Sequence, residues 1–206
     1  MPAFSFSFRD YWTRPTILNS IYVNFGLNYD GKTYGQIYSV DPKDWSTIWV
    51  DDVRGGTWQD RWYMKYDTNR GIIEYADAYP KKAYQPFSQW SVIRFVSGSE
   101  IFWGKNQTIG DTVSTTFIVN PLTSTFPTPP GSGTQIVKFI AQYPTFTTRT
   151  GQKYNDVIVV TYDQIFNGKN AGARYWFARG KGTIQLSWRS NGQDLSASLN
   201  SPLVAS

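Results

Sequence analysis

The feature that most constrains the fold of this chain is an alternation of apolar and polar side chains with a period of two residues. Phe4, Phe6 and Phe8 alternate with serines, and the same pattern recurs at 21–25 and 58–67. Successive side chains of a β-strand point to opposite faces of a sheet, so this period predicts strands that are buried on one face. No long window shows the 3.6-residue period of an amphipathic helix.

Turn residues separate these strands at hairpin spacing, as in Asn69-Arg70-Gly71, Thr150-Gly151 and Gly180-Lys181-Gly182. One helical turn is expected at 42–46, with Asp41 as its cap. Many short antiparallel strands without helices predict an all-β fold. We expect an antiparallel β-sandwich of jelly-roll type, with a calycin-like β-barrel as the alternative. The further strand candidates are 34–39, 45–50, 71–76, 90–96, 100–103, 111–119, 134–141, 143–149, 155–162, 173–179 and 183–189.

Residues 120–134 interrupt the strand pattern with proline, glycine, serine and threonine. We interpret them as a long connection within a single β-rich domain that spans 1–206. The alternative is a linker between two subdomains, 1–119 and 135–206. The part after the linker is short for a separate core, which favours the single domain.

The stretch from Arg174 to Trp188 combines an aromatic pair, a small residue, a basic residue and Gly-Lys-Gly with an apolar strand. It resembles the closing hairpin of small barrel-like domains in bacterial envelope proteins. The resemblance is limited to this hairpin. It implies a barrel or half-barrel and no functional residue.

The absence of two residue types excludes much chemistry. The chain has no Cys, so it forms no disulfide, thiol nucleophile or thiolate metal site. It has no His, which excludes Ser-His-Asp and Cys-His catalysis and nearly all zinc chemistry. Glycine-rich phosphate loops, the Gly-x-Ser-x-Gly frame and EF-hand spacing are also missing. We therefore expect no cofactor and no metal.

The charge pattern gives little indication of the partner or the compartment. The net charge is +5 with a pI of about 9.3, and the charged residues are dispersed. The first residues show no secretory signal pattern, and no apolar stretch is long enough to span a membrane. We expect no membrane partner and cytoplasmic synthesis, with a virion as a second destination.

Carboxylates are the main candidates for catalysis in a chain without His. The chain has only two Glu, Glu74 and Glu100. A glycosidase needs two carboxyl groups that face each other across the scissile bond. Glu74 with Asp77 is the best local pair, and Glu100 would join it if folding brings the two segments together. The competing interpretation is that these carboxylates form salt bridges at strand ends.

Aromatic residues make up 17% of the chain, more than one core is expected to use. The segment 75–90 has two prolines and no clean period, so we interpret it as a loop that presents aromatic rings. Loop aromatics can stack on sugar rings, and neighbouring polar groups can bind hydroxyls. The competing interpretation is a loop pinned to the core by its own rings. The predicted ligand-binding residues are Arg61, Tyr63, Asp77, Tyr79, Lys81, Tyr84 and Trp90.

Three functions from different classes follow from these patterns. The first is a non-enzymatic protein that binds carbohydrate or another polar surface through exposed aromatics. The second is a phage or virion structural protein, with a homo-oligomer or virion components as partners. The third is a carbohydrate-active enzyme that uses Glu74, Asp77 and Glu100. The run 61–66 interleaves cations with rings, as proteins that bind single-stranded nucleic acid do, and would place Arg61, Tyr63 and Lys65 on an exposed face. The net charge is low, so nucleic acid is a disfavoured partner.

Overall fold

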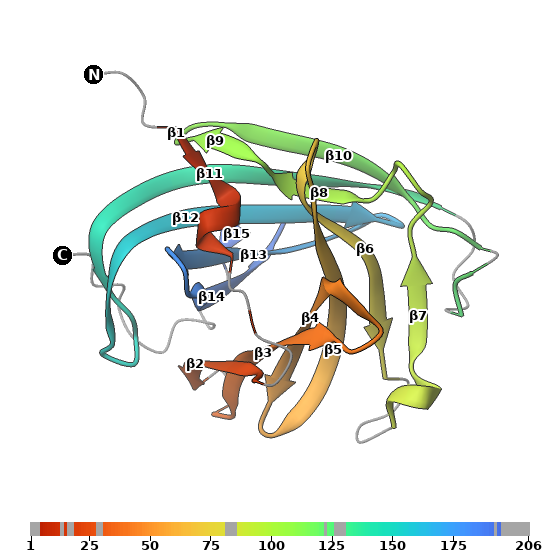
Figure 1. Ribbon diagram of the computed structural model, residues 1–206, viewed down its shortest axis with the longest axis horizontal. Coiled ribbons are helices and arrows are strands. Elements are labelled where there is room, and N and C mark those ends of the chain that lie inside the picture. Colours follow the sequence, from red (N-terminus) through yellow and green to blue (C-terminus); the bar gives the residue numbers. More distant parts are fainter. Residues whose placement is uncertain are drawn as a thin grey trace.

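The computed structural model describes residues 5–12, 15, 19–27, 31–80, 86–121, 123–125, 131–191 and 193–194. Most of these residues lie in antiparallel strands, which form two large sheets and one two-stranded sheet (Figure 1). The helical segments in these ranges are two short 3-10 turns, η1 (Phe8–Tyr11) and η2 (Phe87–Gln89). The expected all-β sandwich is confirmed.

The first large sheet contains seven strands and is built mainly from consecutive hairpins, with β2 at one edge. Near its other edge, β6 pairs with both β7 and β8. The strands are β2 (Ile21–Leu27), β3 (Thr33–Asp41), β4 (Asp44–Arg54), β5 (Thr57–Asp67), β6 (Gly71–Tyr79), β7 (Ser91–Arg94) and β8 (Ile101–Gly104).

The second large sheet contains six strands in sequence order, and its long central strands curve over the first sheet (Figure 1). Its strands are β10 (Thr112–Ile118), β11 (Ser132–Thr147), β12 (Lys153–Phe166), β13 (Lys169–Ala178), β14 (Gly182–Ser190) and β15 (Gln193–Asp194). The small sheet pairs β1 (Ser5–Ser7) with β9 (Asn106–Thr108).

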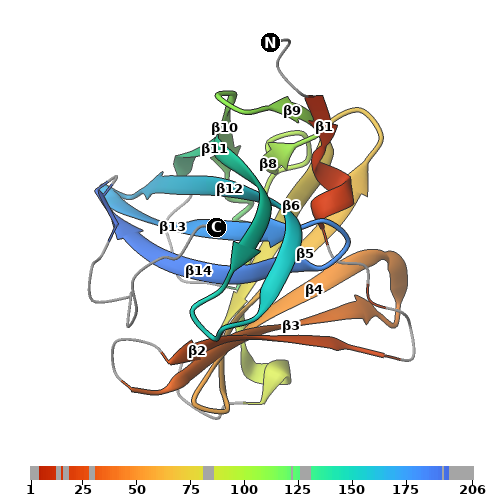
Figure 2. The same ribbon diagram turned by 90° about the vertical axis from the view of Figure 1, so that its left-hand side faces the viewer.

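The two large sheets face each other and approach at both flanks (Figure 2). On one flank β14 lies next to β2, and on the other β8 lies next to β10. A single bridge between Phe95 and Val119 adds to the second contact. The interior between the sheets is therefore closed on two sides.

The main core lies between the sheets and is rich in aromatic rings. Trp103 is 1% exposed and contacts the rings of Trp62, Tyr162 and Tyr175, which joins both sheets. A smaller cluster lies on the opposite face of the second sheet, where Trp176 stacks on Phe146. Burying two faces of one sheet uses more rings than a single core would.

Segment η1 docks onto the second sheet through residues distant in sequence. The hydroxyl of Tyr11 donates to Asp156 Oδ1 at 2.7 Å. Arg179 Nη1 pairs with Asp10 Oδ2 at 2.8 Å and its Nε bonds Asp156. The beginning of the described chain is thus fixed to β12 and to the β13–β14 hairpin.

Two local expectations are wrong. Residues 42–46 form no helical turn, because Pro42 and Lys43 make a tight turn between β3 and β4 in which Lys43 N donates to Asp41 Oδ1. The separate strands expected at 134–141 and 143–149 are one strand, β11. An irregularity between Phe139 and Ala141 shifts the register without ending the pairing with β12.

The connection at 120–134 falls between paired strands, since β10 before it pairs with β11 after it. Whether the chain is a single domain or two subdomains stays a prediction. Within the described ranges, no helix is long and apolar enough to cross a bilayer.

Candidate functional site

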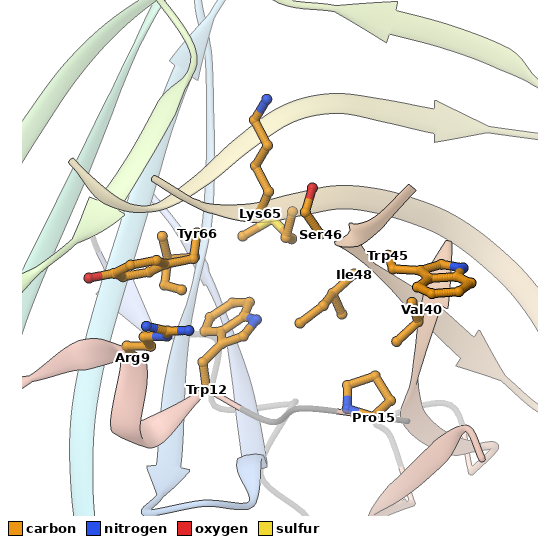
Figure 3. A pocket seen from close by; sticks show the side chains of 11 residues that line it. Arg9, Trp12, Pro15, Val40, Trp45, Ser46, Ile48, Lys65 and Tyr66 are labelled. Atoms are coloured by element: carbon orange, nitrogen blue, oxygen red, sulfur yellow. The ribbon is translucent and has the colours of Figure 1, made fainter. Parts of the chain in front are cut away.

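A cleft of about 370 Å³ lies between η1 and the first large sheet (Figure 3). Clefts that bind small ligands are concave, mostly apolar and about 300–1,000 Å³ in volume, so this one is at the small end of that class. Its described lining comes from η1 and from strands β3 to β6. The lining residues used below are Arg9, Trp12, Trp45, Ile48, Lys65 and Tyr66.

Arg9 reaches the cleft because of the geometry of η1. Residues three apart share one face of a 3-10 turn, and the buried pair here is Phe8 and Tyr11. Arg9 is therefore on the exposed side of the turn. Its guanidinium carbon lies 4.1 Å from the centroid of the Tyr66 ring, a cation–π contact between η1 and β5.

Trp12 follows η1 and packs between the core and the cleft. It is 4% exposed, and its ring contacts those of Phe8, Trp103 and Phe177. Its indole Nε1 is buried, and no described group accepts a hydrogen bond from it. In Figure 3 this nitrogen lies on the side of the ring that faces Ile48. Trp12 therefore contributes an apolar ring to the wall of the cleft.

Trp45 lies at the rim of the cleft and is 69% exposed. It follows Asp44 directly at the start of β4. Asp44 Oδ1 accepts hydrogen bonds from the amide and hydroxyl of Ser46, and Oδ2 accepts one from Thr47 Oγ1 at 2.8 Å. These bonds lower the pKa of Asp44 below its usual value and fix the backbone that presents the indole.

The charge of the cleft is positive. Its described lining includes Arg9 and Lys65 and no carboxylate. Figure 3 shows the Lys65 side chain directed away from Trp12, and its Nζ lies 5.1 Å from the centroid of the Tyr75 ring. Arg9, in contrast, lies beside Trp12 in the same view.

The predicted binding residue Arg61 is placed differently from the sequence expectation. It is 6% exposed and forms a double ion pair with Asp51, with 2.9 Å between Nη2 and Oδ2. Its guanidinium carbon lies 3.9 Å from the centroid of the Trp49 ring. The prediction that Arg61 is exposed is wrong, because β4 places Asp51 directly opposite it.

The aromatic segment 75–90 is also only partly a loop. Tyr79 is the last residue of strand β6, and its hydroxyl donates to Asp77 Oδ2 at 2.8 Å. Trp90 is 7% exposed, so the expected exposure of this ring is wrong. Tyr63 is half-buried on β5 near the rings of Trp49 and Tyr75. The remaining two predicted residues, Lys81 and Tyr84, lie outside the described residues.

The carboxyl groups of Glu74 and Asp77 come together inside the molecule. Glu74 Oε2 accepts a hydrogen bond from Trp103 Nε1 at 3.2 Å. Burial raises the pKa of Asp77 to about 6, and the bonds from Glu74 and Tyr79 lower it only in part. Burial and the charge of Asp77 raise the pKa of Glu74 well above its usual value. The pair therefore binds a proton more tightly than two exposed carboxyl groups do.

A second carboxyl pair, Asp52 and Asp60, lies on the neighbouring strands. Asp52 accepts hydrogen bonds from Tyr34 at 2.6 Å and Gln36 at 2.8 Å. Burial raises the pKa of Asp52 to about 6 and that of Asp60 well above its usual value. Asp60 Oδ1 is buried and has no hydrogen-bond partner among the described residues.

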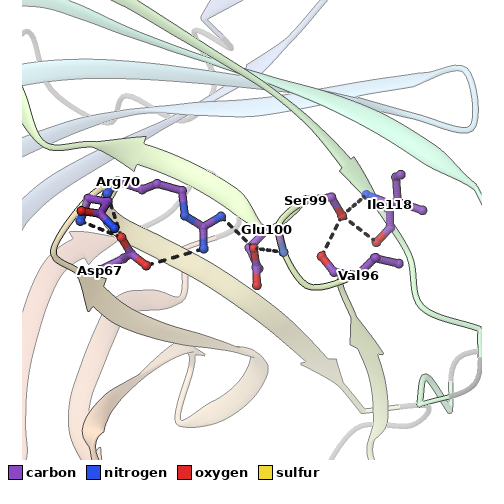
Figure 4. Close-up of polar contacts among 8 residues, drawn as sticks. Asp67, Arg70, Val96, Ser99, Glu100 and Ile118 are labelled. Atoms are coloured by element: carbon purple, nitrogen blue, oxygen red, sulfur yellow. Dashed lines mark hydrogen bonds and ion pairs between the residues drawn. The ribbon is translucent and has the colours of Figure 1, made fainter.

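Glu100 lies on a different face from this cluster. It precedes Ile101, whose Cα pairs with Glu74, but its Oε2 accepts from Arg70 Nη1 at 2.8 Å (Figure 4). Burial alone would raise the pKa of Glu100, and the bonds from Arg70 and Gly98 lower it below its usual value. This is the salt-bridged arrangement that the sequence offered as the competing interpretation.

These positions limit the chemistry of the predicted catalytic set. Retaining glycosidases separate their two carboxyl groups by about 5 Å, and inverting enzymes separate them further. Glu74 and Asp77 instead bond to each other, which leaves no room between them for a glycosidic bond. No group of three or more His, Cys, Asp or Glu side chains suited to a metal ion occurs in the described part.

The sequence did not identify the cleft itself. Its alternation predicts a strand through Phe8, whereas the chain turns at that residue and places Arg9 outside. The signal available was the apolar spacing of Phe8, Tyr11 and Trp12, which does not fit a period of two. At 45–50, Trp45 and Trp49 alternate with Ile48 and Val50, so both faces of the strand are apolar and the pattern does not determine which side Trp45 occupies.

Known proteins give no further indication of the site. Comparisons with models of protein families, with curated proteins and with solved structures find no match for this chain.

Proposed function

We propose that this chain is a carbohydrate-binding protein and that the cleft beside Trp45 receives the sugar. The observation that carries the proposal is the 69% exposure of Trp45 at the rim of this cleft. An exposed indole offers a flat apolar surface with a polar edge, and such a surface suits the apolar face of a sugar ring.

The other parts of the cleft support the same function. Apolar side chains such as Ile48 line it, and its polar groups are few, as in other small-ligand sites. The hydrogen bonds that Asp44 accepts fix the backbone at Trp45, so little conformational entropy is lost there on binding.

The test is a glycan array followed by titration calorimetry with each sugar that binds. We expect wild-type protein to bind a subset of glycans and Trp45→Ala to weaken binding by about tenfold or more, because it removes the stacking surface. The matched control is Tyr22→Ala, which removes another exposed ring, 54% exposed, from a separate cavity.

Either of two results would count against this proposal. One is an array without any bound glycan. The other is binding that survives Trp45→Ala and is lost in Tyr22→Ala, which would place the ligand in the second cavity. The virion structural role and the enzymatic role stay predictions, and no described feature favours them over binding.

A further inference from the structure

We propose that the sugar bound in this cleft carries an acidic group and that Arg9 binds that group. This inference rests on the proposed carbohydrate function and names the chemistry of its ligand. Its physical basis is the absence of a described acidic partner for Arg9, the stacking of Arg9 on Tyr66 and the charge of the cleft wall.

Arg9 differs from several other arginines of the described chain in having no acidic partner. Arg61, Arg70, Arg179 and Arg189 each form an ion pair with an Asp or Glu side chain. No described carboxylate pairs with Arg9, whose guanidinium stacks on Tyr66 instead. A cation that is held in place without a counter-charge favours an anion from outside the chain.

The stacking also prepares Arg9 for a planar anion. When a guanidinium lies over an aromatic ring, one face is occupied, and the N–H groups project from its edge. A carboxylate can accept two parallel hydrogen bonds from such an edge. Contact with Tyr66 at 4.1 Å already restricts the Arg9 side chain, so less conformational entropy is lost when the anion binds.

The rest of the described cleft wall has no negative charge that would repel an anion. No carboxylate is present in its described lining, and Lys65 adds a second positive charge. Asp10, the acidic neighbour of Arg9, is paired with Arg179. The charged groups of the described wall therefore suit a ligand that carries negative charge.

The test compares matched ligands that differ only in charge. Oligogalacturonate and its methyl ester share one sugar skeleton, and a sulfated oligosaccharide provides a second kind of anion. We expect wild-type protein to bind the free acid about tenfold more tightly than the ester, because a charge-assisted bidentate contact is lost in the ester. A preference for sulfated over neutral sugars would likewise support an acidic ligand, with a sulfate ester as the acidic group.

Two variants assign the effect to Arg9. Arg9→Gln should abolish the preference for the acid, and Arg9→Lys should restore part of it, since the charge returns without the bidentate geometry. Lys43→Gln removes the same charge from an exposed turn outside the cleft and should leave the preference intact. Thermal unfolding of each variant checks the fold, which an exposed side chain without an ion pair should not disturb.

The outcomes separate the two proposals. Equal binding of acid and ester, or an acid preference that persists in Arg9→Gln, overturns the acidic ligand. If neutral sugars bind and depend on Trp45, the carbohydrate function stands while this inference falls. If no glycan of any kind binds, both fall together.

Discussion

Asp52 and Asp60 lie opposite each other on strands β4 and β5, and their carboxyl groups bond to each other in the interior. Glu74 and Asp77 form a similar pair on β6. Two carboxyl groups in contact cannot both be ionised at low cost, so each pair retains a proton where an exposed acid would lose it. This relationship determines how the stability of the protein responds to pH.

We expect the free energy of unfolding to decrease as the pH rises from about 5 to about 8. In the unfolded chain these carboxyls titrate near about 4. Because burial raises the folded-state pKa of Asp52 and Asp77 to about 6 and those of Asp60 and Glu74 well above their usual range, their contribution is full below the unfolded pKa. It is lost as the pH rises through the folded values. Urea denaturation at several pH values measures the decrease.

Asp60→Asn should flatten this pH dependence, because an amide replaces one acid of the pair. Asp41→Asn is the control, since an amide oxygen can keep the turn bond to Lys43. Carboxyls with a lowered pKa, such as Asp156 beside Arg179, lose their contribution only when the pH falls below about 4. A stability that stays constant or rises from about pH 5 to about pH 8 would contradict the shared-proton arrangement.

The buried ion pair of Asp51 and Arg61 should be costly to break from one side. Asp51→Ala leaves a guanidinium without its counter-charge where the side chains are 1% and 7% exposed. We expect a loss of about 3–5 kcal/mol in the free energy of unfolding, measured by urea denaturation.

The double variant Asp51→Leu with Arg61→Met should recover most of that loss, because it removes both charges and keeps apolar volume. Asp10→Ala, which removes the 47%-exposed partner of Arg179, should cost less than about 1 kcal/mol. A loss equal to that of Asp51→Ala at this exposed pair would show that burial does not set the cost.

Gly172→Ala should weaken the second sheet. Gly172 lies on β13 opposite Asp163 of β12, and a Cβ atom there would overlap the carbonyl oxygen of Tyr162. The strands would have to separate locally, at a cost of about 1–3 kcal/mol in thermal or chemical unfolding. Ala171→Ser, at the exposed neighbouring position, should stay within about 0.5 kcal/mol of wild type.

Trp45 should dominate the quenching of tryptophan fluorescence by iodide. It is the only one of the nine Trp residues, all of which are described, among the exposed large hydrophobics, so a quencher in water reaches it most easily. Trp45→Phe should remove most of the quenchable fraction, whereas Trp90→Phe should leave it nearly unchanged. Equal quenching in both variants would mean that the rim of the cleft is covered in solution.

Local rules predicted much of the fold. The turns at Thr150-Gly151 and Gly180-Lys181-Gly182 join the hairpins as expected, and Gly151 has the positive φ of 81° that a residue with a side chain rarely adopts. The alternation at 58–67 correctly places Trp62 and Met64 in the core. These features depend on neighbours in sequence, which a single sequence shows.

The candidate site depends on contacts between distant strands, which alternation does not specify. Arg61 lies on the opposite face of β5 from Trp62, and the alternation predicts that this face is exposed to solvent. Its burial follows from the register that brings Asp51 and Trp49 to the same face. Likewise, Trp176 lies on the opposite face of its strand from Tyr175 and Phe177, and the alternation predicts that one of these faces is exposed. The rings of a second cluster bury Trp176 instead.

The cleft was least predictable because it combines two segments without a shared motif. Arg9 meets Tyr66 only after η1 packs against the sheet. A sequence pattern can indicate that rings are in excess. It cannot indicate which ring stays at a rim, because that depends on what the remaining chain covers.

The attachment of η1 has a consequence for how the molecule is made. Tyr11 and Asp10 meet partners that are 145 and 169 positions later in the chain. During synthesis, the apolar side chains of η1 therefore lack their final contacts until β12 and the β13–β14 hairpin have left the ribosome. Contacts between such distant positions slow folding and leave apolar surface exposed until they form. Segment η1 is therefore accessible to a chaperone for longer than a hairpin whose two strands are neighbours in sequence.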